Sequence, residues 1–285
     1  MACAATGCVV ATLLCPVILA AQASSRESFC KNNLKQLGFA LHNYHDMHKT
    51  FPPGWITRNR GTLAETGISW QTLLLPVMDQ TNLYIKIDHN RGFDPRANAK
   101  SLEPFHTAVK GLRCPSDTTA PQNPFRGGWA TSNYSGNGGH RPFPRWSALP
   151  GISFWPGNAP YQPQQSSGLF GPNTNFGVRD IVDGTSNTIM VGERSIKSGA
   201  GIWAGVTSNA QENDVITDGS HASRIQHSLS GFSSMHKNVQ FLMCDGAVRA
   251  IKSDIDSQPN TDPAKPLGLF QKLMSRSDGQ PLEAF

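Results

Sequence analysis

Apolar and polar positions divide the chain into an uncharged leader, an amphipathic segment and a long mixed body. Residues 2–25 carry no charged side chain. In residues 26–49, apolar side chains recur at helical spacing and define one face: Leu34, Leu37, Leu41 and Tyr44. Phe51-Pro52-Pro53-Gly54 ends this pattern, because the residue before a proline is pushed out of the helical region. The pattern predicts one long helix, apolar first and amphipathic afterwards.

The leader has three interpretations. Its uncharged run approaches the ~20 residues that span a bilayer, although Pro16 lies within it and would kink the helix. A cleaved signal peptide is the first rival, since Ala21-Gln22-Ala23 is an A-x-A site, but no positive region precedes the run. A buried core helix is the second rival. We expect a membrane anchor over residues 1–23, continued by an amphipathic helix over residues 24–50.

The body, residues 51–285, has the pattern of an α+β domain. Ser69 is a candidate N-cap for a short helix, and residues 102–112 suggest another. A buried strand is expected over residues 188–193, after a turn. Residues 239–251 read as a hairpin around Asp245-Gly246, a strong short hairpin signal. We expect a loop-rich insertion over about residues 120–175, which is rich in Pro, Gly, Asn and aromatic residues.

Composition narrows the possible functions. Only 16% of residues are charged, while Gly and Pro together number 47, which favours many turns and short strands. The formal net charge is +5 without a long basic block, so no nucleic-acid partner is expected. No cofactor is predicted either.

The six cysteines are divided between the leader and the body. Three lie in the leader, and Cys30, Cys114 and Cys244 lie beyond it. No Cys-x-x-Cys occurs, which argues against a zinc knuckle or a thioredoxin-type site. If the body is exported, a disulfide between Cys30 and Cys114 is the expected pairing, because oxidising compartments favour it. The alternative is two buried free thiols.

Four separated motifs resemble the signature of the DUF1559 family of prepilin-like bacterial proteins. They are the Cys-Lys-Asn-Asn-Leu helix start with the following Pro-Pro-Gly, a Cys-Pro-Ser-Asp element, an Asp-Gly-Thr-Ser-Asn element with Gly-Glu, and a C-terminal His…Asp-Gly element. The family-motif residues are Cys30, Asn33, Leu34, His42, Tyr44, His45, Pro52, Cys114, Pro115, Asp183, Gly184, Thr185, Asn187, Glu193, His236, Asp245 and Gly246.

The resemblance implies a pilin-like architecture, with a long N-terminal helix packed on an antiparallel sheet. It also implies a single-pass inner-membrane protein with an exported head, related to type IV pilus or type II secretion assemblies. The chain departs from the family pattern in two places. The family's Gly-Phe-Thr-Leu-Ile-Glu cleavage motif is absent, so we expect either a start assigned too late or a lost processing signal. Eight residues, rather than nine, separate His236 from Asp245.

Histidines supply two further hypotheses. His42, His45 and His48 are spaced by three, so neighbouring pairs could share a metal with Asp46. Packed, hydrogen-bonded histidines are the favoured alternative, because a pair supplies too few ligands for a closed zinc site. His236 and Asp245 invite an acid–base interpretation, but no nucleophile motif accompanies them. We therefore expect no enzyme.

Two binding hypotheses complete the sequence evidence. Hard oxygen ligands at Asp254, Asp256, Asn260 and Asp262 make a weak calcium candidate, although their spacing does not follow an EF-hand. Aromatic side chains of the insertion could stack on an extracellular glycan: Trp129, Trp146, Trp155 and Tyr161. The favoured alternative is that these aromatic residues cover a small core, since Trp is highly buried on average.

The sequence thus favours a membrane-anchored pilin- or pseudopilin-like structural protein. Its expected partners are the membrane, through the N-terminal helix, and copies of itself or other pilin-like subunits. Small residues in the leader would permit close helix contacts within a membrane. The alternative is an exported ligand-binding module that uses the aromatic insertion.

Overall fold

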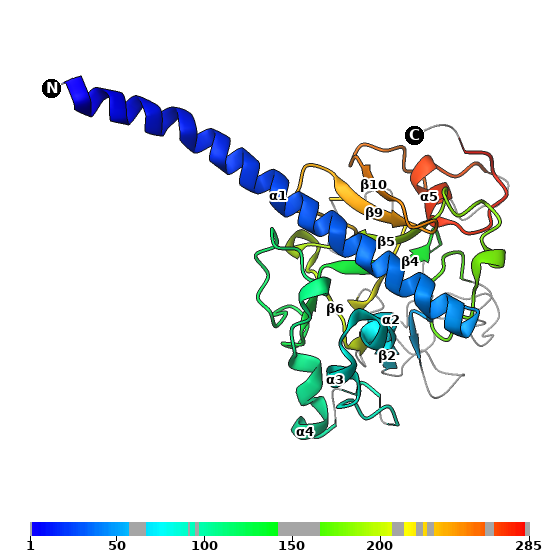
Figure 1. Cartoon of the computed structure of the whole chain (residues 1–285). Helices are drawn as coiled ribbons and strands as arrows, with labels where there is room; N and C mark the ends of the chain where they lie inside the picture. The colour runs from blue at the N-terminus through cyan, green and yellow to red at the C-terminus, as the bar shows by residue number, and fades with distance from the viewer. Residues whose placement is uncertain are drawn as a thin grey trace.

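One long helix and a compact head make up the structure, which is a computed structural model. It describes residues 2–56, 67–90, 92–94, 97–141, 166–206, 214–220, 225–226, 231–259 and 265–282, with side chains from residue 19 onward. Helix α1 covers Ala2–His48. Its C-terminal part crosses the head, and its N-terminal part extends away from it (Figure 1).

The principal sheet has five strands in the order β10-β9-β5-β4-β8. Their bounds are β4 Tyr134–Gly139, β5 Ile189–Glu193, β8 Ile216–Asp218, β9 Val239–Met243 and β10 Val248–Ile251. Every pair in it is antiparallel except β4–β8, which is parallel. The expected α+β class, with a long helix packed on a sheet, is confirmed, and this parallel pair is the one departure from an antiparallel sheet.

Smaller elements surround this sheet. Two short sheets are built from β1 Trp55–Ile56, β2 Gly67–Ser69 and β7 Gly205–Val206, and from β3 Thr131–Ser132 and β6 Gly201–Ile202. The short helices are α2 Trp70–Leu74, α3 Thr81–Tyr84, α4 Ala99–Leu102 and α5 Leu269–Met274. The 3-10 turns are η1 Leu75–Met78, η2 Glu103–His106, η3 Lys110–Leu112, η5 Val178–Asp180 and η6 Ile196–Ser198.

The predicted apolar face of α1 is the face that packs on the head. Leu34, Leu37 and Leu41 are fully buried, and Tyr44 packs partly buried against the same core. Between them, a Cβ placed on Gly38 would lie 3.0 Å from the side chain of Leu242 on β9. Glycine at this position therefore lets the helix approach the sheet closely.

The head covers only the C-terminal part of α1. Residues 19–26 are exposed, which the buried-core interpretation of the leader does not predict. The anchor expected over residues 1–23 falls mainly on residues 1–18, whose side chains lie outside the described part. Within the residues that the structure describes, no helix is long and apolar enough to cross a membrane.

Local signals predicted some short elements and missed others. Ser69 caps α2 as expected, since its hydroxyl accepts a hydrogen bond from the Thr72 backbone at 3.1 Å. The single helix predicted over residues 102–112 is wrong: the segment contains the end of α4, then η2 and η3. Pro104 lies in the first turn of η2, and Thr107 and Val109 adopt extended backbone angles that interrupt the helix.

The predicted strand and hairpin are both present. Strand β5 occupies residues 189–193. Strands β9 and β10 pair antiparallel on either side of the Asp245-Gly246 turn, where Asp245 accepts a hydrogen bond from the Ala247 backbone at 2.8 Å. Gly246 has a φ of 85°, a conformation that favours glycine.

Candidate functional site

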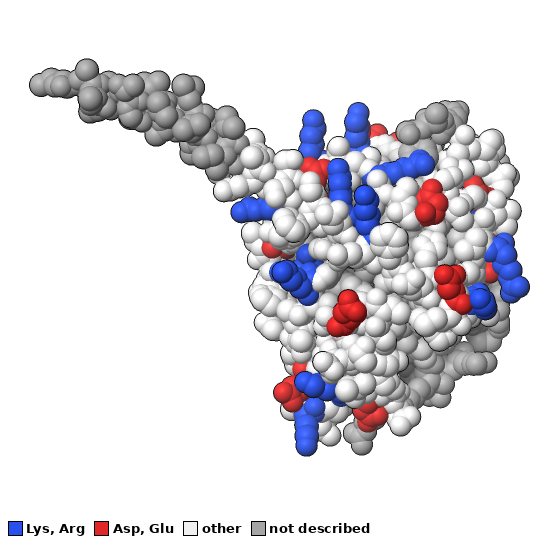
Figure 2. Space-filling view, viewed as in Figure 1, with Lys and Arg blue, Asp and Glu red and all other residues white. Residues whose placement is uncertain are grey.

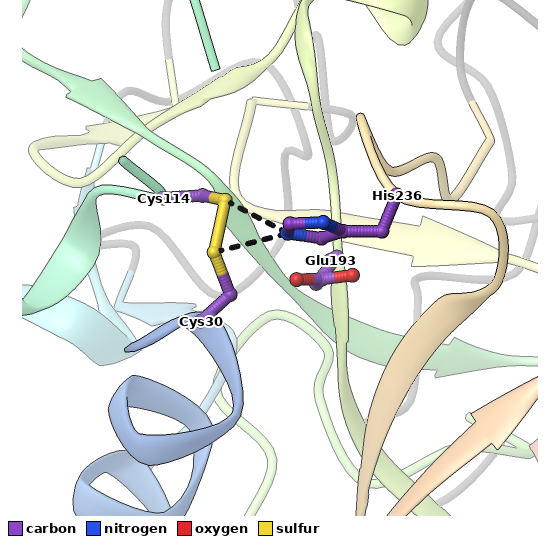
Figure 3. Close-up of side chains that lie close together, drawn as sticks. All are labelled: Cys30, Cys114, Glu193 and His236. Carbon is purple, nitrogen blue, oxygen red and sulfur yellow. Dashed lines mark hydrogen bonds between the residues drawn. A yellow bond between two sulfur atoms is a disulfide. The ribbon is translucent and has the colours of Figure 1, made fainter. Parts of the chain in front are cut away.

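Four side chains from distant parts of the chain meet where α1 joins the head. Cys30 lies on α1, Cys114 follows η3, Glu193 ends β5, and His236 lies in the loop before β9. Figure 3 shows the two sulfur atoms facing the imidazole, with the carboxylate beside it. One ligating atom from each residue lies within 4.8 Å of the others. We call these four residues the Cys–His–Glu cluster.

A disulfide joins Cys30 to Cys114, and the expected pairing is confirmed over the free-thiol alternative. The two Cα atoms are 5.2 Å apart, within the usual range for a disulfide, and the residues are 84 positions apart in sequence. Cys30 is fully buried and Cys114 nearly so. The bond therefore ties the long helix covalently to the head, deep in the interface between them.

Hydrogen bonds hold the same junction. The Asn33 side chain, one turn along α1, donates to the Arg113 carbonyl at 2.8 Å. The backbone N–H of Cys114 donates to the Asn133 side chain at 2.9 Å. Asn33 is thus a second, non-covalent tie between the helix and the Cys114 loop.

The aspartate of the Cys-Pro-Ser-Asp element has a structural role. The buried Asp117 carboxylate accepts hydrogen bonds from the backbone N–H groups of Thr119 and Ile196, each at 2.7 Å. It links the Cys114 loop to η6. Pro115, which lies between Cys114 and Asp117 in the sequence, is exposed.

His236 is hydrogen-bonded to the disulfide. Its Nε2 lies 3.4 Å from the Cys30 sulfur and 3.6 Å from the Cys114 sulfur. Partial burial lowers the pKa of His236, with Glu27 opposing and Lys31 reinforcing the effect. A neutral imidazole is therefore favoured, and a neutral imidazole can act as a metal ligand.

Glu193 is a buried carboxylate that makes no ion pair with any described residue, although the charge of Lys31 acts on it. It is 2% exposed, and its Oε2 accepts a hydrogen bond from the Gln240 backbone at 2.9 Å. Burial raises the pKa of Glu193 to about 7, although that hydrogen bond and the nearby Ser234 hydroxyl act in the opposite direction. Its Oε1 is buried and makes no hydrogen bond of good geometry with any residue that the structure describes.

Sequence reasoning singled out every member of this cluster but did not group them. The acid–base interpretation pairs His236 with Asp245, and the structure does not bring these two together. Strand β9 separates them, since its five residues extend roughly 16 Å at ~3.3 Å per residue. The one available signal was that all four positions belong to family motifs.

The Asp-Gly-Thr-Ser-Asn motif forms a structural joint. The Asp183 carboxylate accepts hydrogen bonds from the Asp278 and Gly279 backbones at 2.6 and 3.0 Å, which fixes the C-terminal segment. The Thr185 carbonyl accepts from the Asp245 backbone at 3.0 Å. Within the turn, the Asn187 side chain donates to the Asp183 carbonyl at 3.2 Å, and Gly184 has a φ of 99°. The two Asp-Gly turns therefore lie against each other.

Each of the three helix histidines has a structural partner, and His42 and His45 both pack against Phe51. His42 packs edge-on against Phe51 and His48 lies against Tyr44. His45 Nε2 accepts a hydrogen bond from the Val178 backbone at 3.3 Å. The metal group suggested for these histidines is not formed in the described part of the chain, where the Cys–His–Glu cluster is the one group of this kind. Pro52 is buried just beyond the helix end.

The calcium candidate does not assemble around its described members. Asp256 accepts a hydrogen bond from the Leu269 backbone at 3.0 Å, at the start of α5, and another from the Gln258 side chain. Asp254 is exposed. Asn260 and Asp262 lie outside the described residues.

Trp129 does not offer a free face for stacking. It is 8% exposed, its ring is stacked with His106 at 4.7 Å, and Phe93 meets it edge-on. Trp129 therefore belongs to the core, as the favoured interpretation predicts, and not to a glycan site. The other three aromatic residues of that hypothesis, Trp146, Trp155 and Tyr161, lie outside the described residues.

Comparison with known proteins identifies one family. A family model described as "SBP_bac_10: Protein of unknown function (DUF1559)" matches residues 20–258. Neither a curated protein nor a solved structure matches the chain.

Proposed function

The chain belongs to the DUF1559 family, and from this premise we propose that it is a membrane-anchored, pilin- or pseudopilin-like structural subunit with an exported head. In this proposal the uncharged residues 2–25 root the helix in the inner membrane. The head then stands on the membrane-distal part of α1. The proposal assigns the chain no catalytic activity.

The observation that carries this proposal is the division of α1 into a packed part and a projecting part. From Cys30 onward the helix is buried along one face, whereas residues 19–26 are exposed. A helix that served only the core would end near the edge of the head. A helix that continues beyond it is suited to reach a membrane or a neighbouring subunit.

The outer face of the packed part also favours assembly. Phe29, Phe39 and Met47 are 59%, 71% and 60% exposed. Their exposed neighbours are the uncharged Asn32, Gln36 and Asn43, together with one charge of each sign at Lys35 and Asp46. Large exposed apolar side chains on an otherwise weakly charged helix face are what a helix-to-helix contact between subunits would bury.

Positive charge lies where the proposal places the membrane surface. Figure 2 shows several Lys and Arg side chains over the part of the head next to the point where α1 leaves it. Such side chains near an anionic bilayer contribute about 1 kcal/mol each to membrane attraction. This supports a head that rests close to the bilayer.

Site-specific photocrosslinking tests the assembly part of the proposal. A photoreactive phenylalanine analogue at Phe39 should yield crosslinked oligomers in intact cells. The matched control is the same analogue at Ile85, which is 70% exposed but directly follows α3 and is not on α1. It should give no crosslinked oligomers. Equal crosslinking at both positions, or none at Phe39, would reject the helix face as an assembly surface.

Membrane fractionation tests the anchor separately. The full chain should sediment with membranes and resist alkaline extraction, whereas a chain lacking residues 2–23 should be released as folded protein. Equal solubility of the two would reject the anchor. The glycan-binding alternative is not advanced, because Trp129 is a core residue and its other three aromatic residues lie outside the described part of the chain.

A further inference from the structure

We propose that the Cys–His–Glu cluster is a zinc site in the reduced protein, so that the Cys30–Cys114 pair alternates between a disulfide and two zinc-bound thiolates. This inference concerns the joint between α1 and the head. It does not depend on whether the chain assembles into a filament.

The donor set matches the chemistry of zinc. Zinc in proteins is bound by thiolate, imidazole and carboxylate, most often four ligands in a tetrahedron. The cluster offers two sulfurs, one imidazole nitrogen and one carboxylate oxygen, which is a complete set of four. Two thiolates and one carboxylate carry three negative charges, of which the ion would neutralise two.

The spacing between the imidazole and the two sulfurs also fits, and the Glu193 carboxylate lies within 4.8 Å of them. Bond lengths of about 2.3 Å to sulfur and 2.0–2.2 Å to nitrogen and oxygen place tetrahedral ligand atoms about 3.3–3.8 Å apart. The His236 Nε2 already lies 3.4 and 3.6 Å from the two sulfurs. Once the disulfide is opened, rotation of the cysteine side chains would give the sulfurs the same spacing, while the Cα atoms stay 5.2 Å apart.

The environment of the Glu193 carboxylate points to a bound cation. Its side chain is almost fully buried and its Oε1 has no well-formed hydrogen bond in the described structure. A buried carboxylate in this state is costly unless a cation or a proton compensates it. An ion bound between Cys30, Cys114 and His236 would supply that compensation. Since His236 is only half-buried, solvent can reach the cluster from its side.

The chemical steps balance with a dithiol as reductant. Thiol–disulfide exchange breaks the Cys30–Cys114 bond, forms the disulfide of the dithiol and leaves both cysteines as thiols. Zinc binding then displaces the two thiol protons. Reoxidation by another disulfide reverses the process and releases the ion.

Metal binding to the full chain tests the inference. The assay uses detergent-solubilised protein whose leader cysteines are replaced by serine: Cys3, Cys8 and Cys15. After reduction with a phosphine, the protein should retain one zinc per chain after gel filtration, measured by mass spectrometry of the metal. The oxidised protein should retain none. Cobalt should give a thiolate-to-cobalt charge-transfer band in the reduced protein alone.

Single variants establish the ligands. His236→Ala and Glu193→Gln should each weaken zinc binding at least about tenfold, since even outer-shell changes at zinc sites cost ~10–100-fold. Both variants should still form the disulfide, as counted by free thiols. Cys244→Ser is the matched control, because Cys244 is a buried thiol outside the cluster, and it should bind zinc like the parent.

If the reduced chain stays folded, two outcomes would overturn the inference. One is a folded, reduced chain that retains no stoichiometric zinc. The other is zinc binding that survives both His236→Ala and Glu193→Gln. If reduction unfolds the chain, zinc must restore its native circular dichroism in the parent but not in His236→Ala. A reduced chain that stays unfolded in zinc would equally reject the site.

Discussion

Reduction of the Cys30–Cys114 disulfide should destabilise the protein by a large and calculable amount. The bond closes a loop over a sequence separation of 84. In the chain-entropy model, opening a loop of this length lowers the free energy of unfolding by about 4.5 kcal/mol at 25 °C. Typical domains have a free energy of unfolding of only about 5–15 kcal/mol, so this loss is a large part of the total.

The measurement compares oxidised and phosphine-reduced protein by urea denaturation in detergent. A chelator keeps zinc out, so that only the bond differs between the two samples. The expected result is a fall of about 4 kcal/mol in the extrapolated free energy of unfolding. The Cys30→Ala, Cys114→Ala double variant is the control, because the phosphine should not change its denaturation curve.

A difference below about 1.5 kcal/mol would refute this reasoning, because it would place the disulfide at the low end of the range seen for such bonds. It would mean that the helix and the Cys114 loop remain associated in the denatured state without the bond. The Asn33 hydrogen bond to the Arg113 carbonyl would then be the first candidate for a residual tie.

Three further predictions concern other parts of the head. In the oxidised protein, the pKa of Glu193 is raised to about 7 from 4.5, so the folded state holds the proton more tightly than the unfolded state. The free energy of unfolding should therefore fall by roughly 3 kcal/mol between pH 4.5 and 7. Glu193→Gln should abolish this pH dependence, as measured by urea unfolding across that range. Gly192→Ala should lower stability by about 1–3 kcal/mol by thermal or urea unfolding, because its Cβ would lie 2.5 Å from Phe232 and 2.6 Å from Phe241. Asp183→Ala removes two backbone hydrogen bonds and should raise hydrogen exchange of the C-terminal segment, at a cost of about 2–3 kcal/mol.

Local sequence patterns predicted the parts of the fold that depend on neighbouring residues. The apolar face of α1, the Ser69 cap and the Asp245-Gly246 hairpin all follow from short-range spacing and turn chemistry. The helix expected over residues 102–112 failed because extended residues between η2 and η3 interrupt a pattern that looked continuous. Pattern spacing alone does not reveal that interruption.

The candidate site depended on contacts that local patterns do not encode. His236 bonds to Cys30 across a sequence separation of 206. The sequence marked both residues as motif members but gave no reason to join them. Pairing His236 with Asp245 followed from their nearness in sequence, yet an intervening extended strand carries the two apart.

The motif residues of α1 act together as a two-ended clamp. At one end of the packed stretch, the disulfide at Cys30 and the hydrogen bond from Asn33 fix the helix to the Cys114 loop. At the other end, His45 accepts a hydrogen bond from the Val178 backbone, and the Phe51 backbone donates to Phe176 at 2.7 Å. Because both ends are held, the helix cannot slide or pivot on the sheet without breaking one of them. A pull on the projecting part of α1 would therefore act first on the hydrogen bond from the Gln240 side chain to Glu27 and then on the disulfide, which is the bond that the proposed zinc site would replace.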